Sequence, residues 1–133
     1  TLSTVTERVI QYPLQEGYVS QGYSIFHPAL DIAAPRDTEI RPIKDGVIED
    51  ISKSKVGYGN AIIVDHGNGI ISLYAHLSKI NVSKGDKVTV FDTIGNVGTT
   101  GHSTGPHLHI EVRKNGIPIN PFAVLPTLAS SKL

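Results

Sequence analysis

Hydrophobic and polar residues alternate along several short stretches of the chain, with the two-residue period of β-strands. This alternation, or an enrichment in β-branched residues, marks the runs 38–43, 46–52, 60–66, 69–76, 87–91 and 107–113. No longer stretch shows the period of about 3.6 residues that indicates an amphipathic helix. The pattern therefore predicts an all-β fold of mostly antiparallel strands, with at most short helical turns.

Turn-forming residues separate these runs. Asn68-Gly69 lies between two of them, and Asn115-Gly116 follows the last one. The Asn-Gly pair favours a two-residue hairpin turn, because both positions tolerate a positive φ angle. Gly85-Asp86 is a third candidate turn.

The length and composition fit one domain. The chain has 133 residues, of which 39% are hydrophobic, and this is enough for a single core. We expect an N-terminal arm over 1–13, the domain itself over 14–125 and a C-terminal tail over 126–133. Cysteine is absent, which excludes disulfides and zinc sites built on thiolates.

Charge and hydropathy limit the partners. Twelve basic residues balance twelve acidic ones, so no net charge favours nucleic acid or an anionic membrane. No apolar run approaches the roughly 18 residues that a transmembrane helix needs. The first ten residues lack the basic and apolar regions of a signal peptide. We therefore expect no nucleic-acid partner and no transmembrane segment in this chain.

The run 107–113 has a polar face with unusual chemistry. His107 and His109 are two residues apart, so a strand places both imidazoles on one face, and Glu111 continues that face. Leu108 and the apolar residues that alternate with these groups would face the core. Such a pair is typical of an ordinary exposed strand face or of a functional site, and this stretch alone leaves both interpretations open.

A second cluster lies in the sequence HPALDIAAP, where His27 precedes Asp31 by four residues. On a helix this spacing would put them on one face, but Pro28 and Pro35 leave room for only one helical turn. We expect His27 on a loop and Asp31 on a strand that begins near Leu30. The alternative is a carboxylate that simply accepts a hydrogen bond from a surface histidine.

A third candidate, His76, stands at the end of the run 69–76. By alternation it shares a face with Tyr74, and taken alone it is best interpreted as a structural histidine. Taken together, the clusters supply more groups than a closed structural metal site needs. A catalytic zinc takes about three protein ligands from histidine and carboxylate, which leaves further histidines for acid–base work.

These motifs resemble the zinc metallopeptidases of the lysostaphin and LytM type, the M23 family of peptidoglycan endopeptidases. HPALDIAAP matches the family's H-x-x-x-D, LYAHLS its central histidine, and STGPHLHIEVRKNG its H-x-H with flanks. IIVDHGNG and VSKGDKV match in kind, and the resemblance covers roughly 20–125. One departure is Ala29, where the family often has glycine.

The resemblance implies a zinc site in a groove of a LytM-type domain, with His27, Asp31 and His109 as ligands. It implies that His76 and His107 form the catalytic pair, and leaves open which is the base. Zinc lowers the pKa of bound water to about 7, which suits peptide hydrolysis at neutral pH. The expected substrate is a stem peptide or crosslink of bacterial peptidoglycan, outside the cytoplasm, with the protein as a monomer.

Other polar residues have weaker claims. Glu111 is either a partner of a ligand histidine or a plain surface group. His66, at the Asn-Gly turn, is expected to be exposed, and His102 could touch substrate. Tyr18 and Tyr23 are expected to pack in the core or at the rim rather than to stabilise an oxyanion.

Two other functions compete with the endopeptidase. A catalytically silent LytM-type module that regulates a cell-wall amidase would lack some of the five groups, and this chain has all of them. A carrier domain of the lipoyl or sugar-phosphotransferase type is suggested by VSKGDKVTVFDTIGNVG. A lipoyl domain needs a lysine at a hairpin tip, which Asn68-Gly69 does not provide, and a phosphocarrier does not need the full histidine and aspartate set.

Overall fold

The computed structural model describes residues 11–101, 103 and 105–125, and these are almost entirely β-strands and loops. Its elements are β1 (Tyr18–Gln21), β2 (Leu30–Ala33), β3 (Glu39–Ile40), β4 (Gly46–Ser52), β5 (Ala61–Gly67), β6 (Ile70–Ala75), β7 (Leu77–Ile80), β8 (Lys87–Val88), β9 (Gly95–Val97), β10 (His107–Lys114), β11 (Ile117–Ile119) and the 3-10 turn η1 (Pro121–Ala123). The predicted fold class is confirmed. No helix in these ranges has the length and apolar character to cross a membrane.

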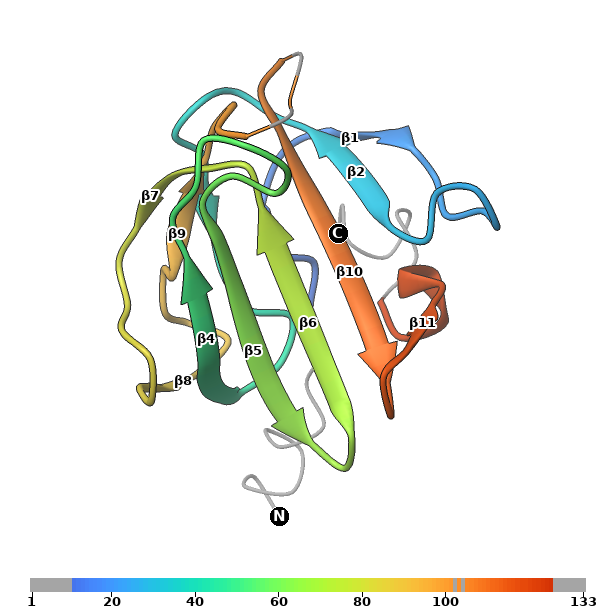
Figure 1. The fold of residues 1–133 in the computed structure, drawn as a ribbon, viewed down its shortest axis with the longest axis vertical. Coiled ribbons are helices and arrows are strands. Elements are labelled where there is room, and N and C mark those ends of the chain that lie inside the picture. Colours follow the sequence, from blue (N-terminus) through green and yellow to red (C-terminus); the bar gives the residue numbers. More distant parts are fainter. Residues whose placement is uncertain (1–10, 102, 104, 126–133) are drawn as a thin grey trace.

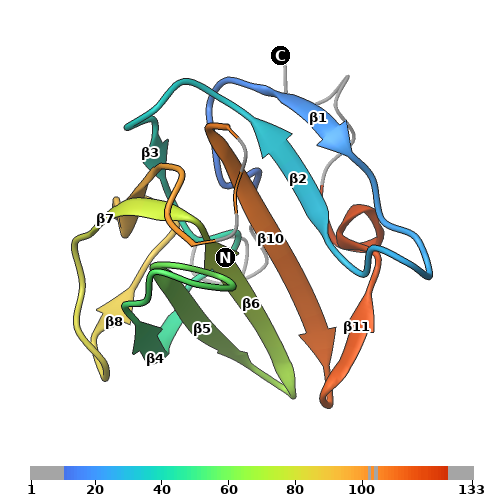
Figure 2. The same cartoon turned by 45° about the horizontal axis from the view of Figure 1, so that its top comes forward.

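The strands form two antiparallel sheets within the described ranges (Figures 1 and 2). The larger sheet has the order β1-β2-β10-β6-β5-β4-β8, with β11 paired to β10. The smaller sheet has the order β3-β9-β7. Strand β10, close to the C-terminal end of the described chain, therefore lies between β2 and β6. This order joins segments that are far apart in the sequence.

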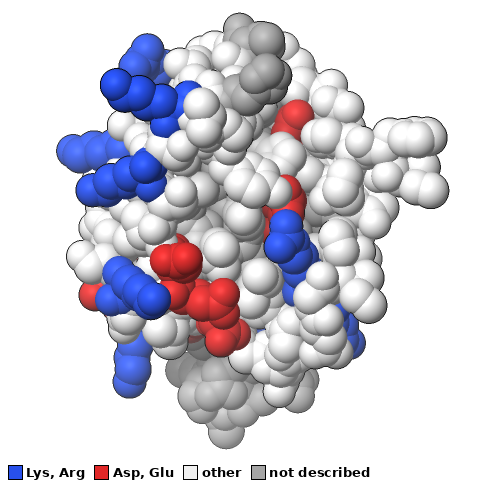
Figure 3. Space-filling view, in the orientation of Figure 1, with Lys and Arg blue, Asp and Glu red and all other residues white. Residues whose placement is uncertain are grey.

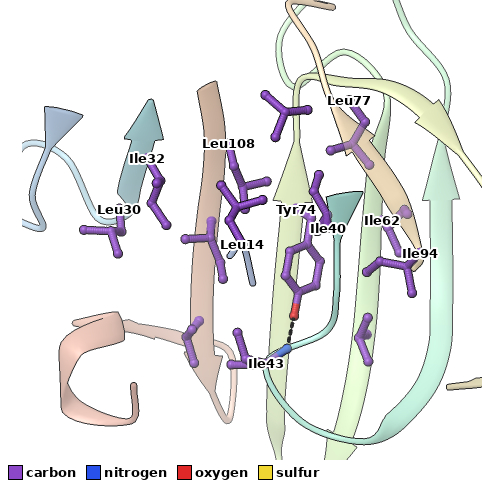
Figure 4. Close-up of a cluster of buried hydrophobic side chains, with 14 of the residues drawn as sticks. Leu14, Leu30, Ile32, Ile40, Ile43, Ile62, Tyr74, Leu77, Ile94 and Leu108 are labelled. Carbon is purple, nitrogen blue, oxygen red and sulfur yellow. Dashed lines mark hydrogen bonds between the residues drawn. The ribbon is translucent and has the colours of Figure 1, made fainter. Parts of the chain in front are cut away.

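The alternation predicted for β10 is confirmed in the core. Leu108, Ile110 and Val112 are fully buried and belong to one large apolar cluster, together with Leu30 of β2 and Tyr74 of β6. In Figure 4, Leu30 and Leu108 lie on one side of the Tyr74 ring, and Ile62 and Ile94 lie on the other. The Tyr74 hydroxyl accepts a hydrogen bond of 3.0 Å from the backbone N–H of Ile43.

The predicted turns are also confirmed. Asn68 and Gly69 link β5 to β6, and Asn115 and Gly116 link β10 to β11. All four have positive φ angles, as a two-residue hairpin turn of type I′ requires. The hairpins fix the register of the strands that they join.

Charged side chains of both signs occur on the face shown in Figure 3. Lys and Arg gather along its left margin, acidic groups lie beside them lower down, and single groups of both signs lie just right of the middle. On this face, therefore, the balanced charge of the sequence is spread out, without one dominant sign.

Residues 11–13 pack against the domain. The Gln11 backbone N–H donates to the Ile43 carbonyl over 2.8 Å, and the Pro13 carbonyl accepts from Arg41 N–H over 2.9 Å. The division into an arm, a domain and a tail stays a prediction. Residues 1–10 and 126–133, and the candidate His102, lie outside the described residues.

The expectation of an exposed His66 is wrong. Its Nδ1 lies 3.0 Å from the Asp45 carbonyl and its Nε2 lies 2.7 Å from the Ser72 hydroxyl, which in turn bonds to Tyr74. Because a carbonyl oxygen only accepts, Nδ1 donates and Nε2 accepts from Ser72. A short polar chain therefore runs from the surface to the buried Tyr74 ring.

Stability is expected to fall in acid through His66. Burial lowers the pKa of His66 below its ordinary value of 6.5, so the unfolded state takes up this proton more readily than the folded state. Its contribution is therefore complete above pH 6.5 and decreases as the pH falls through the lowered value. Urea unfolding from about pH 7.5 to 5 should show a smaller loss in His66→Gln than in the unaltered protein. Equal losses in the two proteins would contradict this role.

Candidate functional site

Three predicted ligands converge at one end of the large sheet. His27 lies on the loop before β2, Asp31 lies on β2 and His109 lies on β10, directly opposite Asp31 in the strand register. One ligand atom from each lies within 4.8 Å of the other two. The predicted positions of His27 on a loop and Asp31 on a strand are confirmed.

The orientation of the imidazoles fits a bound cation. His27 places Nδ1 3.0 Å from the Gly22 carbonyl, which can only accept, so Nδ1 carries the proton and the Nε2 lone pair faces Asp31 at 3.2 Å. His109 directs Nδ1 to Asp31 at 2.8 Å and Nε2 to Glu111 at 2.9 Å. Two imidazole nitrogens thus converge on one carboxylate, which is a suitable donor set for zinc.

The close approach of these groups shifts their pKa values. Burial alone would lower the pKa of His109, but hydrogen bonds to Asp31 and Glu111 raise it to about 9. Burial would likewise raise the pKa of Asp31, yet the hydrogen bond from His109 and the nearby imidazoles hold it below its usual value. The His109 ring is thus held between two carboxylates.

The two histidines predicted to handle protons lie together beside this cluster. The rings of His76 and His107 have centroids 5.1 Å apart. The Nδ1 atom of each faces a backbone carbonyl, that of Thr100 at 2.8 Å for His76 and that of Gly105 at 2.9 Å for His107. Each Nδ1 is thus a donor, which leaves Nε2 of both rings able to accept a proton.

The alternation predicted for His76 is wrong. Tyr74 is buried in the large apolar cluster, whereas Ala75 lies opposite His109 on the other face of the sheet. His76 comes directly after β6 and has a φ angle of +66°, which interrupts the strand period. This left-handed residue places its imidazole beside His107 and His109 instead of in the core.

Glu111 is a buried partner of the site and not a surface group. Its side chain accepts from Tyr58 over 2.5 Å and from Arg113 over 2.6 Å, besides its contact with His109. Burial would raise the pKa of Glu111, but these donors lower it to about 2. Burial and the bond to this carboxylate raise the pKa of Tyr58 to about 12. The carboxylate thus stays ionised and holds the His109 ring in place.

Sequence reasoning missed Tyr58 and Arg113. Arg113 continues the polar face of β10 at the two-residue spacing, so the alternation could have identified it. Tyr58 is 53 residues from Glu111 and lies on the loop between β4 and β5. Its sequence context gives no sign of this contact.

A groove of about 620 Å³ surrounds the cluster. It is lined by Gln21, His27, Asp31, Gly57, Tyr58, His76, Ser103, His107 and His109. All five predicted site residues therefore face one cavity. Tyr18 is exposed and lies outside this lining, and the Tyr23 hydroxyl bonds to the Pro118 carbonyl over 3.5 Å.

Two glycines allow the loops above this groove to touch. Gly59 and Gly101 have φ angles of +66° and +73°, and a Cβ atom built on Gly101 would lie 2.3 Å from the Gly59 nitrogen. No side chain larger than hydrogen fits between these backbones. The close approach fixes the loop of Tyr58 against the loop that precedes β10.

Comparison with known proteins identifies the family. Residues 25–121 match the model of "Peptidase family M23". The chain belongs to this family. The matched region begins just before His27 and ends beyond Arg113, so it includes all five predicted site residues and the groups that contact His109.

Individual relatives agree with this assignment. DD-carboxypeptidase/endopeptidase Mpg of Neisseria meningitidis is 51% identical over 102 residues, which are 76% of this chain and 23% of the relative. Peptidoglycan DD-endopeptidase ShyA of Vibrio cholerae is 40% identical over 105 residues, which are 79% and 24% of the two chains. This chain therefore spans about a quarter of the length of these relatives.

A solved structure supports the fold. The zinc-containing peptidase from Vibrio cholerae superposes with a TM-score of 0.82 at 30% identity, covering 90% of this chain and 41% of that one. The M23-type architecture expected from the sequence is confirmed.

The contact between Glu111 and His109 can be tested by substitution. Glu111→Gln should keep the fold but weaken metal affinity about 10- to 100-fold, because an amide is a poorer acceptor for the ligand imidazole. Competition with a chromogenic zinc chelator measures this change. Glu49→Gln is a matched control, since Glu49 is an exposed residue of β4. Equal affinity in both variants would show that Glu111 does not support the ligand.

Proposed function

We propose that this protein is a zinc-dependent endopeptidase that hydrolyses peptide crosslinks of bacterial peptidoglycan, outside the cytoplasm. The observation that supports it most is the juxtaposition of two groups of side chains. His27, Asp31 and His109 supply a ligand set within 4.8 Å, and the His76 and His107 rings lie next to it, 5.1 Å apart. A merely structural site needs no such adjacent pair.

Zinc held by His27, Asp31 and His109 would supply a Lewis acid that polarises a peptide carbonyl and lowers the pKa of a water molecule. His76 and His107 each present Nε2 to the groove with Nδ1 fixed by a carbonyl. One of them takes a proton at Nε2 from the attacking water, and the other, once it is protonated at Nε2, donates to the developing oxyanion or to the leaving amine. Their fixed Nδ1 atoms keep both rings in the orientation for this transfer.

The names of two relatives support a choice of substrate class. The relative at 51% identity is named a DD-carboxypeptidase/endopeptidase, and the relative at 40% identity is named a peptidoglycan DD-endopeptidase. We infer a DD-type crosslink as the substrate rather than a glycine bridge. The test is digestion of purified peptidoglycans of both crosslink types, followed by mass spectrometry of the fragments. Release of fragments only from the glycine-bridged polymer would refute this choice, and release from neither would favour a silent binding module.

Single substitutions should separate metal ligands from proton-handling groups. His109→Ala and Asp31→Ala should lose both zinc and activity. His76→Ala and His107→Ala should keep zinc while the turnover rate falls on the order of 10²–10⁴-fold. Elemental analysis and turnover on a crosslinked peptide measure the two properties. A zinc-free His107→Ala beside a zinc-loaded His109→Ala would reverse the assigned roles.

Chelation should remove activity without unfolding the protein. Asp31 and His109 stand on strands that pack around a core in which the structure describes 18 buried residues, and this core needs no metal. Far-UV circular dichroism should therefore stay β-type after treatment with a chelator, and added zinc should restore turnover. Loss of the β spectrum on chelation would indicate a metal that holds the fold together.

A further inference from the structure

Strand β1 contains an irregularity next to the candidate metal ligands His27, Asp31 and His109. Val19 lies opposite Ile32 of β2, but Gln21 lies opposite Asp31, so two steps along β1 match one step along β2. The Ser20 hydroxyl donates to the Asp31 carbonyl over 3.3 Å at this point. The extra residue is a β-bulge, a feature that often redirects a side chain beside a functional site.

The bulge changes the face to which Gln21 belongs. In a regular ladder Gln21 would lie opposite Leu30, whose side chain is fully buried in the core. In the observed register it lies opposite Asp31, and directly opposed residues share a face. Its side chain accordingly lines the groove together with His27 and Asp31.

Gln21 and two of the candidate metal ligands form a row across the sheet. Gln21 of β1 lies opposite Asp31 of β2, which lies opposite His109 of β10. Neighbouring strands are about 4.8 Å apart, so Gln21 stands about one strand spacing beyond Asp31. His76, which follows β6, is on the other side of the row. A peptide bound over the cluster along this row would have Gln21 at one end and His76 at the other.

The chemistry of Gln21 suits a peptide backbone. Its carboxamide has a donor and an acceptor, the same pair that a peptide group presents. Other uncharged polar side chains of the groove have partners: the Tyr58 hydroxyl bonds to Glu111, and the Ser103 hydroxyl bonds to the Gly105 carbonyl over 2.9 Å. The Gln21 carboxamide makes no hydrogen bond to the residues that the structure describes.

We propose that Gln21 is a substrate-binding residue whose carboxamide hydrogen-bonds the peptide backbone of the crosslink on the β1 side of the scissile bond. This inference depends on the proposed function, since it assigns one end of the same groove. The bulge in β1 is the structural device that exposes Gln21 to the substrate.

Gln21→Met tests the carboxamide, because methionine keeps the side-chain length and removes both hydrogen-bonding groups. KM for a DD-crosslinked muropeptide should rise roughly three- to tenfold, the effect of one ordinary hydrogen bond, while kcat and zinc content stay unchanged. Gln15→Met is the matched control, since Gln15 is exposed and lies outside the groove lining.

A binding measurement makes the test independent of turnover. The dissociation constant of the same muropeptide is measured by calorimetry on zinc-loaded His76→Ala protein, with and without Gln21→Met. We expect it to rise by the same factor as KM, and an unchanged constant would overturn the role of Gln21. A protein that binds the peptide in a Gln21-dependent way but never cleaves it would refute the endopeptidase and leave this inference standing. If the unaltered protein does not bind the peptide, both proposals fail.

Discussion

The pleat of β10 is the constraint on which the site depends, because it puts two incompatible environments on opposite sides of one strand. Leu108 and its apolar neighbours lie in the fully buried core, while His107 and His109 line the groove and Glu111 supports His109 from the same face. A shift of register by one residue would place imidazoles in the core and a leucine beside the candidate metal ligands. The hydrophobic core therefore fixes the position of the polar groups as firmly as direct contacts do.

The features that could be predicted from the sequence are those that depend on local patterns of residues. The alternation of 107–113 identified both faces of β10, and the Asn-Gly pairs identified two hairpins. The spacing of His27 and Asp31, flanked by prolines, indicated a loop and a strand. These features depend on residues that are neighbours in the sequence, so the sequence alone was sufficient.

The parts that were missed depend on distant contacts or on breaks in a regular period. His76 has a positive φ angle, which alternation cannot anticipate. His66 is partly buried because its ring reaches the Asp45 carbonyl, 21 residues away. Tyr58 reaches Glu111 from another loop, and Gln21 faces the groove only because of a bulge. Each of these features needs the folded chain to bring its partners together.

The central place of β10 also has a consequence for the dynamics of the site. Its backbone pairs with β2 and β11 on one side and with β6 on the other, so opening it requires the large sheet to separate. Hydrogen exchange of its amides would then proceed only through nearly global unfolding. The floor of the groove therefore keeps His107 and His109 in register for as long as the large sheet is intact.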